Sequence, residues 1–422
     1  MTSKITSQPS CVDPFEPGMI SLAEALTRIE ARVRAVLACE RLPIRDCLNR
    51  VNNEAVKSPR DVPPSPNSAM DGYALAVDSL VDGGIAELEQ IGSAYAGKPF
   101  AGRCGPGQCV RIMTGALIPD GADAVVMQEQ AEIAGNGRIR IDADHRVGEN
   151  MRQAGEDIQR GETVIDAGVR LNPADLGVLA SLGIAQLQVK RKPVVAFFST
   201  GDELAAVGTP LQPGMIYDSN RYSLHGMLAR LPVDSIDLGV VRDNPQAMRE
   251  ALTEAATRAD LIVSTGGVSV GEADYIKPAL ADLGSTEFWK IAIKPGRPLT
   301  FGEIGNSIFM GLPGNPVAVM VTFSQFVVPA IDVLCGAHMR PPLLMPARAL
   351  DRLRKKPGRT EFQRGIASLD ANHRWQVGKT GKQGSGILTS MSRANCFIVL
   401  PDDNAGVEPG DEVSIQFLDW TV

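Results

Sequence analysis

The chain has 422 residues, enough for two to four domains of ordinary size. Hydrophobic residues make up 44% of it and charged residues 22%, a composition typical of soluble proteins with a substantial core. Acidic residues outnumber basic ones by 49 to 42, which disfavours a nucleic-acid binder. The seven scattered cysteines form no C-x-x-C pair or disulfide pattern, so we expect reduced thiols in a cytoplasmic protein.

The pattern of apolar and polar residues changes several times within the N-terminal third of the chain. Residues 1–19 lack an apolar stretch and are predicted to be a tail and not a signal peptide. From residue 20 to about 50 the pattern is helical, and Ser21 with Glu24 fits a capping box. A proline-rich joint then leads into short branched runs separated by glycine and proline turns, which predict a small β domain.

A second short helix is predicted after this β domain, over residues 174–182, with Asn172 or Asp175 as its cap. We expect this helix to pack with the first one, so that residues 20–57 and 162–190 form one discontinuous connecting domain around the β-rich insert, residues 58–161.

Buried strands and helices alternate over residues 191–340, which predicts a parallel, doubly wound α/β sheet. The uncharged stretch 304–331 is broken by glycine and proline near its middle. It therefore reads as a buried strand, a turn and a buried helix, and not as a membrane span. Residues 341–422 again show short strands and predict a small C-terminal β barrel.

Acidic residues follow three of the predicted strands of the α/β region. Glu203, Asp243 and Asp274 lie just after successive strands, and strand ends share one edge of a doubly wound sheet. A single acid at such a place is more often a helix cap, whereas three acids on one rim favour a metal site. Oxygen ligands without cysteine or histidine suit Mg²⁺, which bridges to phosphate groups.

A glycine-rich turn lies beside the third acid and contains Gly266, Gly267 and Ser269. The backbone N–H groups of such turns bind phosphate oxygens. Neither the dinucleotide pattern G-x-G-x-x-G nor the nucleotide-binding pattern G-x-x-x-x-G-K-[ST] occurs, so a nicotinamide enzyme and a P-loop enzyme are both disfavoured.

Three basic residues, Lys290, Lys294 and Arg297, follow the glycine-rich turn. They could face an anionic ligand, or they could lie on the solvated face of a strand, and the sequence favours neither alternative. In the β-rich insert, Asp71, Thr114 and Asp157 occur in turns and by themselves are ordinary turn signals.

Ten motifs in fixed order resemble the molybdopterin molybdotransferase family, which includes MoeA and the E domain of gephyrin. The motifs are NSAMDGYAL, RIMTGALIPDGADAVVMQE, GEDI, STGDEL, YDSNRY, STGGVSVGEADYIK, IKPGRPLTFG, GLPGNPVAV, EFQRG and NCFIVL. Each is modestly specific alone, but the series is highly specific and spans the chain from the first proline joint almost to the C-terminus.

The resemblance implies an elongated homodimer of four-domain subunits and a reaction. Molybdate is inserted into the dithiolene of adenylylated molybdopterin, with Mg²⁺-dependent loss of AMP. The adenylyltransferase of the same pathway is implied as a further partner, whereas nucleic acid and membrane are not expected. Mg²⁺ on Asp243, Asp274 and Glu203, together with Lys290, Lys294 and Arg297, would screen the repulsion between the two anionic reactants.

The resemblance also assigns roles to residues outside the strand ends. Asp71, Thr114 and Asp157 of the partner subunit would close over the cleft. Pro313 and Pro316 would shape its wall, and Arg364 and Ser385 from the C-terminal domain would face the molybdate.

Two alternatives remain at this point. A nucleotide pyrophosphatase similar to CinA could use the same α/β module, but we would expect a TGGLGPT-type loop in place of TGGVSVGEAD. A non-enzymatic scaffold, in the manner of gephyrin, would not need the acidic residues.

Overall fold

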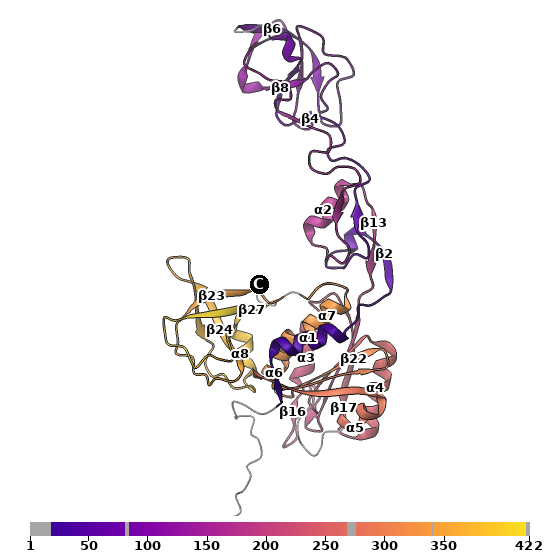
Figure 1. The fold of residues 1–422 in the computed structure, drawn as a ribbon, viewed down its shortest axis with the longest axis vertical. Coiled ribbons are helices and arrows are strands. Elements are labelled where there is room, and N and C mark those ends of the chain that lie inside the picture. The colour runs from indigo at the N-terminus through magenta and orange to yellow at the C-terminus, as the bar shows by residue number, and fades with distance from the viewer. Residues whose placement is uncertain (1–17, 81–83, 268–275, 340, 419–422) are drawn as a thin grey trace, which may run out of the picture. The chain divides into compact units, whose positions relative to one another are not determined.

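The structure is a computed structural model that describes residues 18–80, 84–267, 276–339 and 341–418. The chain divides into two compact units. The main unit contains residues 1–40, 49–51 and 189–422, and the insert unit contains residues 41–48 and 52–188. Figure 1 labels their elements.

A seven-stranded sheet forms the centre of the main unit, in the order β1-β19-β21-β22-β18-β14-β17. The strands of this sheet are β1 Met19–Ile20, β14 Val194–Thr200, β17 Asp234–Val241, β18 Leu261–Thr265, β19 Gly284–Ile291, β21 Pro298–Ile304 and β22 Ser307–Leu312. β17, β14, β18 and β22 run parallel, as the alternating pattern predicts. The predicted doubly wound α/β domain is confirmed.

The sheet is mixed and not wholly parallel, which corrects the prediction. β21 runs antiparallel to both β19 and β22. The connection from β19 to β21 is short, and so is the two-residue turn from β21 to β22. Parallel neighbours need a long crossover, so short connections of this kind impose antiparallel pairing.

Helices cover both faces of the sheet because the buried strands are apolar on both sides. In β14, Val195 and Phe197 belong to one core cluster, while Ala196 and Phe198 belong to the other. This alternation follows from the two-residue period of a strand. The helices are α3 Ser219–Leu228, α6 Pro316–Thr322 and α7 Val328–Leu334 on the first face, with α4 Pro245–Arg258 and α5 Ile276–Leu283 on the second.

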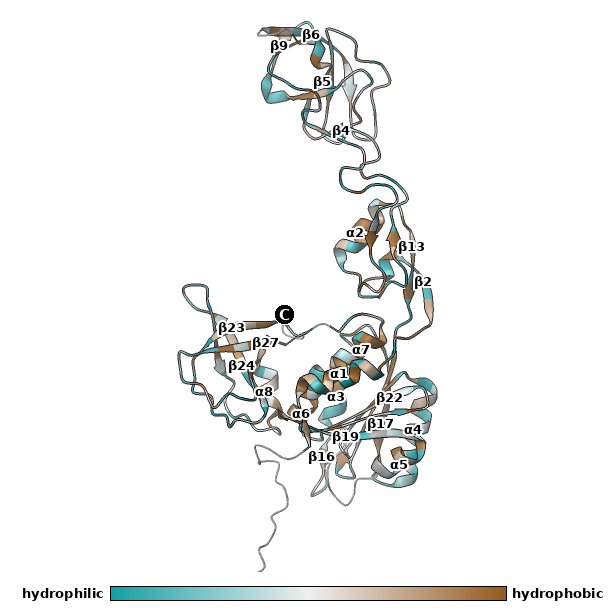
Figure 2. Cartoon of the chain, in the orientation of Figure 1, coloured by the Kyte–Doolittle hydropathy of each residue, from teal (hydrophilic) through white to brown (hydrophobic). Residues whose placement is uncertain are grey.

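The first helix, α1, spans Leu22–Arg32 and belongs to the main unit. The side chain of Ser21 accepts a hydrogen bond from the backbone N–H of Glu24 at 3.1 Å, so the predicted N-terminal cap is confirmed. The helix is shorter than predicted, because the backbone is extended at Val33. In Figure 2, α1 carries both hydrophilic and hydrophobic residues along its length.

α1 and the second short helix belong to different units, and their predicted packing stays a prediction. Ala25 and Ile29 of α1 are fully buried in the same cluster as Phe326 and Ile331, so α1 covers the α/β core. The second helix, α2 (Pro173–Ser181), lies in the insert unit and is capped by the side chain of Asn172. The four-domain division remains a prediction.

The C-terminal region forms a closed barrel, as predicted. Five strands follow one another in the order β24-β25-β23-β27-β26, and a further pairing of β24 with β26 closes the ring. A short strand of the α/β part, β20, also pairs with the start of β24. The bounds are β20 Ile293–Lys294, β23 Leu344–Ala349, β24 Thr360–Leu369, β25 Trp375–Lys379, β26 Cys396–Leu400 and β27 Glu412–Phe417, and a short helix α8 spans Leu388–Arg393.

The insert unit is rich in β structure, as predicted, and its largest sheet has the order β8-β5-β7-β6-β10-β9. The bounds are β5 Gly72–Leu75, β6 Ile85–Ala94, β7 Gln108–Ile112, β8 Ala124–Met127, β9 Ala131–Gly135 and β10 Arg138–Asp142.

Short two-stranded pairs also occur along the chain. They are β2 Cys39–Pro43 with β13 Gln186–Lys190, β3 Val56–Lys57 with β12 Thr163–Ile165, β4 Asn67–Ser68 with β11 Met151–Arg152, and β15 Leu204–Ala205 with β16 Ile216–Tyr217.

One helical stretch, Pro316–Leu334, is long and apolar enough to cross a membrane by length and composition alone. It runs through α6, a π-helical turn over Phe323–Val327 and α7. Of its most apolar window, 72% is buried inside the protein. The predicted order of a buried strand, a turn and a buried helix over this region is confirmed.

Candidate active site

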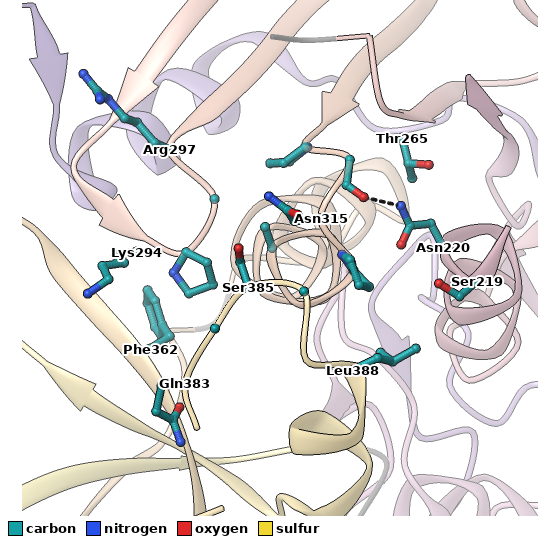
Figure 3. A pocket seen from close by; sticks show the side chains of 18 of the residues that line it. Ser219, Asn220, Thr265, Lys294, Arg297, Asn315, Phe362, Gln383, Ser385 and Leu388 are labelled. Atoms are coloured by element: carbon teal, nitrogen blue, oxygen red, sulfur yellow. Dashed lines mark hydrogen bonds between the residues drawn. The ribbon is translucent and has the colours of Figure 1, made fainter. Parts of the chain in front are cut away.

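A large pocket of about 1710 Å³ opens at the carboxyl ends of the parallel strands of the main unit. Loops that follow β14, β17, β18 and β22 form one side of it, and the C-terminal barrel forms the other. Figure 3 shows the strand-end residues Thr265 and Asn315 on one side and the barrel residues Phe362, Gln383 and Ser385 on the other. Ligands of doubly wound sheets bind at this edge.

The structure brings most of the predicted site residues of the main unit into this one pocket. They are Glu203, Asp243, Gly266, Gly267, Lys294, Arg297, Pro313, Pro316, Arg364 and Ser385. Lys290 is not among the lining residues; it pairs with Met19 and Pro298 inside the sheet. Ser269 and Asp274 lie outside the described residues, and so does the acidic Glu272 beside them. The roles assigned to all of these residues remain predictions.

The turn after β18 strongly favours glycine at both of its first two positions. Gly266 has φ +86° and Gly267 has φ +62°, in the left-handed region that other residues rarely adopt. A Cβ atom on Gly266 would lie 2.7 Å from the backbone oxygen of Thr200. The absence of a side chain therefore lets the backbone of this turn approach the end of β14 closely.

The acidic side of the pocket contains Glu203 and Asp243, which follow β14 and β17. The backbone N–H of Asp243 donates to Oδ1 of Asp202 at 3.3 Å, so the two loops are joined. The described part of the chain contains no group of three or more His, Cys, Asp or Glu side chains arranged to hold a metal ion. The carboxylates of Glu203 and Asp243 fit a hard cation in type, and the third predicted acid, Asp274, is not described.

The basic side of the pocket comes from the barrel and from the strand that joins it. Nζ of Lys294 lies 2.6 Å from Oε1 of Glu361, whose side chain is only 7% exposed. The other oxygen of Glu361 accepts from Nε2 of Gln363 at 2.9 Å. Because β20 pairs with β24 with Lys294 opposite Glu361, backbone and side chains fix this ion pair together.

The pocket lining carries eight basic side chains and four acidic ones, so its charge suits an anion. Five of the basic residues were missed by sequence reasoning: Arg352, Arg354, Arg359, Lys379 and Lys382. Three of them belong to the basic run DRLRKKPGR, residues 351–359, which was the available signal. That run gave no sign of its position, because only the closed barrel brings it to the strand ends.

A buried polar network forms part of the pocket wall and was also missed. Asp218 is 1% exposed and accepts hydrogen bonds from Oγ of Ser199 at 3.0 Å and from Nε of Arg221 at 3.1 Å. Oγ of Ser199 also lies 3.1 Å from Oγ1 of Thr265. Asp218 thus caps α3 and ties the ends of two strands together. The YDSNRY motif contained Asp218 and Arg221, whereas Ser199 and Thr265 belong to the STGDEL and STGGVSVGEADYIK motifs, and no one motif indicated the network.

The wall formed by the PGNP turn is held by a side chain of α3. Nδ2 of Asn220 donates to the backbone oxygen of Gly314 at 2.7 Å, the contact drawn as a dashed line in Figure 3. Pro313 and Pro316 flank Gly314 and stiffen the turn, because proline fixes φ. Asn220 was not predicted as a site residue.

Asp71 and Thr114 lie in the insert unit and contact each other. Oδ1 of Asp71 accepts from the backbone N–H of Thr114 at 2.7 Å and from its Oγ1 at 2.8 Å. These two hydrogen bonds, with a smaller contribution from the charge of Arg111, lower the pKa of Asp71 from its ordinary value of 3.8. Asp157 lines a different cavity of about 450 Å³, together with Asn67 and Arg152.

Replacing Thr114 with Val should raise the pKa of Asp71 toward its ordinary value, because one of its two hydrogen bonds is lost. A lowered carboxyl pKa stabilises the folded state above the unfolded pKa, and this stabilisation is lost as the pH falls through the folded pKa. The wild type should therefore gain more stability between acid and neutral pH than the variant. An NMR titration of the Asp71 carboxyl measures the shift directly. Thr209→Val, at a site where the hydroxyl contacts only a backbone oxygen, is the control, and an unchanged Asp71 titration would contradict the assignment.

Family models match nearly the whole chain. The MoeA N-terminal region (domain I and II) matches residues 20–183, the probable molybdopterin binding domain matches residues 196–333, and the MoeA C-terminal region (domain IV) matches residues 346–418. The second model covers the strand ends that line the pocket, and the third covers the barrel wall.

Relatives and solved structures agree with these models. The chain is 41% identical over 399 residues to the molybdopterin molybdenumtransferase of Haemophilus influenzae, covering 94% of this chain and 98% of that protein. It is 32% identical to gephyrin of Dictyostelium discoideum, covering 89% of this chain and 58% of that protein. The crystal structure of the moeA protein of Pyrococcus horikoshii matches with a TM-score of 0.81 at 29% identity, covering 95% of this chain and all of that one. The chain belongs to the molybdopterin molybdenumtransferase (MoeA) family.

Proposed function

We propose that the chain inserts molybdenum from molybdate into adenylylated molybdopterin in an Mg²⁺-dependent reaction that releases AMP. Its family places it among the transferases of molybdenum cofactor biosynthesis. The adenylylated form of the substrate, the metal and the leaving AMP are the parts that the proposal adds.

The observation that supports the proposal is the combination of opposite charges in one pocket. Glu203 and Asp243 line the same cavity as Lys294 and Arg297, beside the turn at Gly266. An anion site alone would not need the carboxylates, and a simple metal site would not need the cations. A substrate that is a phosphate ester carrying its own divalent cation needs both.

Glu203 and Asp243 would supply oxygen ligands to Mg²⁺, with Asp274 as a third. The bound ion would neutralise charge on the phosphate groups of the substrate. The chain's own cations provide the remaining screening. Molybdate and a pyrophosphate ester repel each other, and the excess of basic residues in the lining lowers the free energy of bringing them together.

The proposal includes a homodimer, because three of the predicted residues lie in the insert unit. Asp71, Thr114 and Asp157 of the partner subunit would complete the pocket. The adenylyltransferase of the pathway would deliver the substrate. We assign the reaction to the cytoplasm, which is consistent with the free thiols of the six described cysteines.

The test is AMP release by the purified chain, given adenylylated molybdopterin, MgCl₂ and molybdate. We expect AMP to appear only when molybdate and Mg²⁺ are both present, and the product to activate a molybdenum-free apoenzyme. Chromatography quantifies the AMP, and omission of molybdate is the control. No molybdate-dependent AMP release would refute the proposal.

The same assay separates the two alternatives. A pyrophosphatase of the CinA type would release AMP without molybdate. That alternative concerns the α/β module, whereas family models match the regions on both sides of it as well. A non-enzymatic scaffold would bind a partner peptide tightly and release no AMP.

A further inference from the structure

One loop of the barrel, residues 380–387, connects β25 to α8 and forms part of the pocket wall. It contains three glycines, Gly381, Gly384 and Gly386, so its backbone has few intrinsic constraints. Gly384, Ser385 and Gly386 line the pocket consecutively. A loop of this composition needs contacts from elsewhere to hold one conformation.

The side chain of Gln383 supplies such contacts by pairing with the backbone of Arg364 in β24. Oε1 of Gln383 accepts from the backbone N–H of Arg364 at 2.7 Å, and Nε2 donates to its backbone oxygen at 3.0 Å. The β24–β25 pairing ends one residue earlier, with Gly365 opposite Lys379. The backbone N–H of Thr380 still donates to the oxygen of Arg364 at 3.1 Å, so the amide of Gln383 replaces the missing strand neighbour at the N–H of Arg364 and adds a second donor to its oxygen.

Two further contacts fix the same loop. The guanidinium of Arg364 is buried and donates to the backbone oxygen of Gly384 at 3.1 Å and to Oγ of Ser390 at 3.0 Å. On the other side, the backbone N–H of Val317, in the first turn of α6, donates to the backbone oxygen of Ser385 at 3.1 Å. The carbonyl groups of the loop are thus directed to the protein on both sides.

The backbone N–H groups of Gly384, Ser385 and Gly386 are in a different situation. Among the described residues, none accepts a hydrogen bond from any of these three groups. Successive backbone N–H groups in a tight loop form a concave site for an anion. Beside the basic residues of the barrel wall, the chemistry that fits is a tetrahedral oxyanion.

We propose that Gln383 is a positioning residue that holds this loop in the conformation in which Ser385 and the three N–H groups bind a tetrahedral oxyanion. The inference rests on the proposed function, in which the oxyanion is either molybdate or a phosphate group of the pterin nucleotide. Gln383 acts through the backbone of Arg364 and the loop, and does not itself contact the anion.

The test compares Gln383→Met with Gln383→Glu. Gln383→Met keeps the length of the side chain and removes the two hydrogen bonds to Arg364 together with the longer ones from Nε2 to the backbone oxygen of Gly381 at 3.3 Å and to Oγ1 of Thr380 at 3.5 Å. Gln383→Glu keeps only the acceptor. We expect Gln383→Met to raise one KM about tenfold, because the loss of an anchored hydrogen-bond pair is of that order, with kcat changed far less. A higher KM for molybdate assigns molybdate to the loop, and a higher KM for adenylylated molybdopterin assigns its phosphate. Gln383→Glu should show a smaller change in the same KM.

Gln376→Met is the matched control. Gln376 is equally half-buried, lies on β25, and donates only to Oγ of Ser368 outside the pocket. If the wild type releases AMP and both KM values of Gln383→Met equal those of this control, the inference is wrong. A lower melting temperature with unchanged KM values would also overturn it, because Gln383 would then be structural only.

Amide hydrogen exchange separates this inference from the proposed function. We expect Gln383→Met to speed exchange severalfold, relative to Gln376→Met, at the amides of Ile387 and Val317, whose N–H groups donate to the loop oxygens of Gly384 and Ser385, whether or not AMP is released. If the wild type released no AMP, the proposed function would fail and the exchange comparison would still test the positioning. Unchanged exchange at these two amides would reject it.

Discussion

Asp243→Asn should reduce the rate of molybdate-dependent AMP release at least about 100-fold. Removing one group that stabilises charge in a transition state lowers a rate by about this factor. The substitution keeps the shape of the side chain and removes the negative charge that we propose as a ligand of Mg²⁺. Asp243 is half-buried at the pocket edge, so we expect the stability to change by less than about 1 kcal/mol. Raising the Mg²⁺ concentration should recover part of the lost rate.

The control for this variant lies on the same strand. Asp234 begins β17, at the edge of the sheet opposite to the pocket, and its exposed carboxylate lies 3.7 Å from Nζ of Lys192 and near the charge of Arg191. Asp234→Asn should leave AMP release within about twofold of the wild type, because exposed pairs contribute little. Equal rates in Asp243→Asn and Asp234→Asn would remove Asp243 from the metal site and leave it as a loop residue.

Lys294→Met should lower both activity and stability, for different reasons. The activity should fall about 100-fold, because a cation that screens the anionic reactants is lost. The free energy of unfolding should fall by about 2 kcal/mol, because Glu361 is buried and would lose its ion-pair partner, keeping the hydrogen bond from Gln363 and the nearby charges of Lys355 and Arg364. This figure is below the cost for a fully buried pair, since the side chain of Lys294 is 52% exposed.

A double variant separates these two effects. In Lys294→Met with Glu361→Gln, the buried charge is absent, so most of the lost stability should return while the activity stays low. Urea unfolding measures the first quantity and AMP release the second. If the double variant regained activity as well, Lys294 would be a counterion of Glu361 and not a ligand of the substrate. Lys192→Met, which breaks an exposed pair, is the control for the loss of a lysine.

The strand ends of the α/β region illustrate what local sequence can predict. The run that leads to Glu203 and the run that leads to Gly266 are uninterrupted apolar strands followed by loop residues. A buried parallel strand has no polar face, so an apolar run marks it, and its loop begins soon after that run ends. β14 and β18 each continue through two buried polar residues, Ser199–Thr200 and Ser264–Thr265, before the loop begins. The position of these residues on one rim followed from this rule, and the structure places them in one pocket.

Other features followed from contacts that no local pattern contains. The helical pattern after residue 20 ran past Arg32, yet the backbone becomes extended at Val33. α1 has an apolar face, and the sequence did not indicate that it would pack against α7. Amphipathic faces specify that a partner exists, and they do not specify which one.

By itself the sequence determined the kinds of element, the doubly wound sheet and the barrel. It also determined which residues follow the strand ends and so lie at the edge of the sheet. These features depend on the two-residue period of strands, the 3.6-residue period of helices and the residue types that form turns. Only the tertiary structure decided that the barrel contributes a basic wall, that Lys294 pairs with Glu361, and that Gln383 anchors the loop of Ser385. Lys294 and Glu361 are 67 positions apart in the chain, and Gln383 and its partner Arg364 are 19 positions apart. These contacts depend on barrel closure and on the pairing of β20 with β24, which bring the residues together regardless of the residues between them.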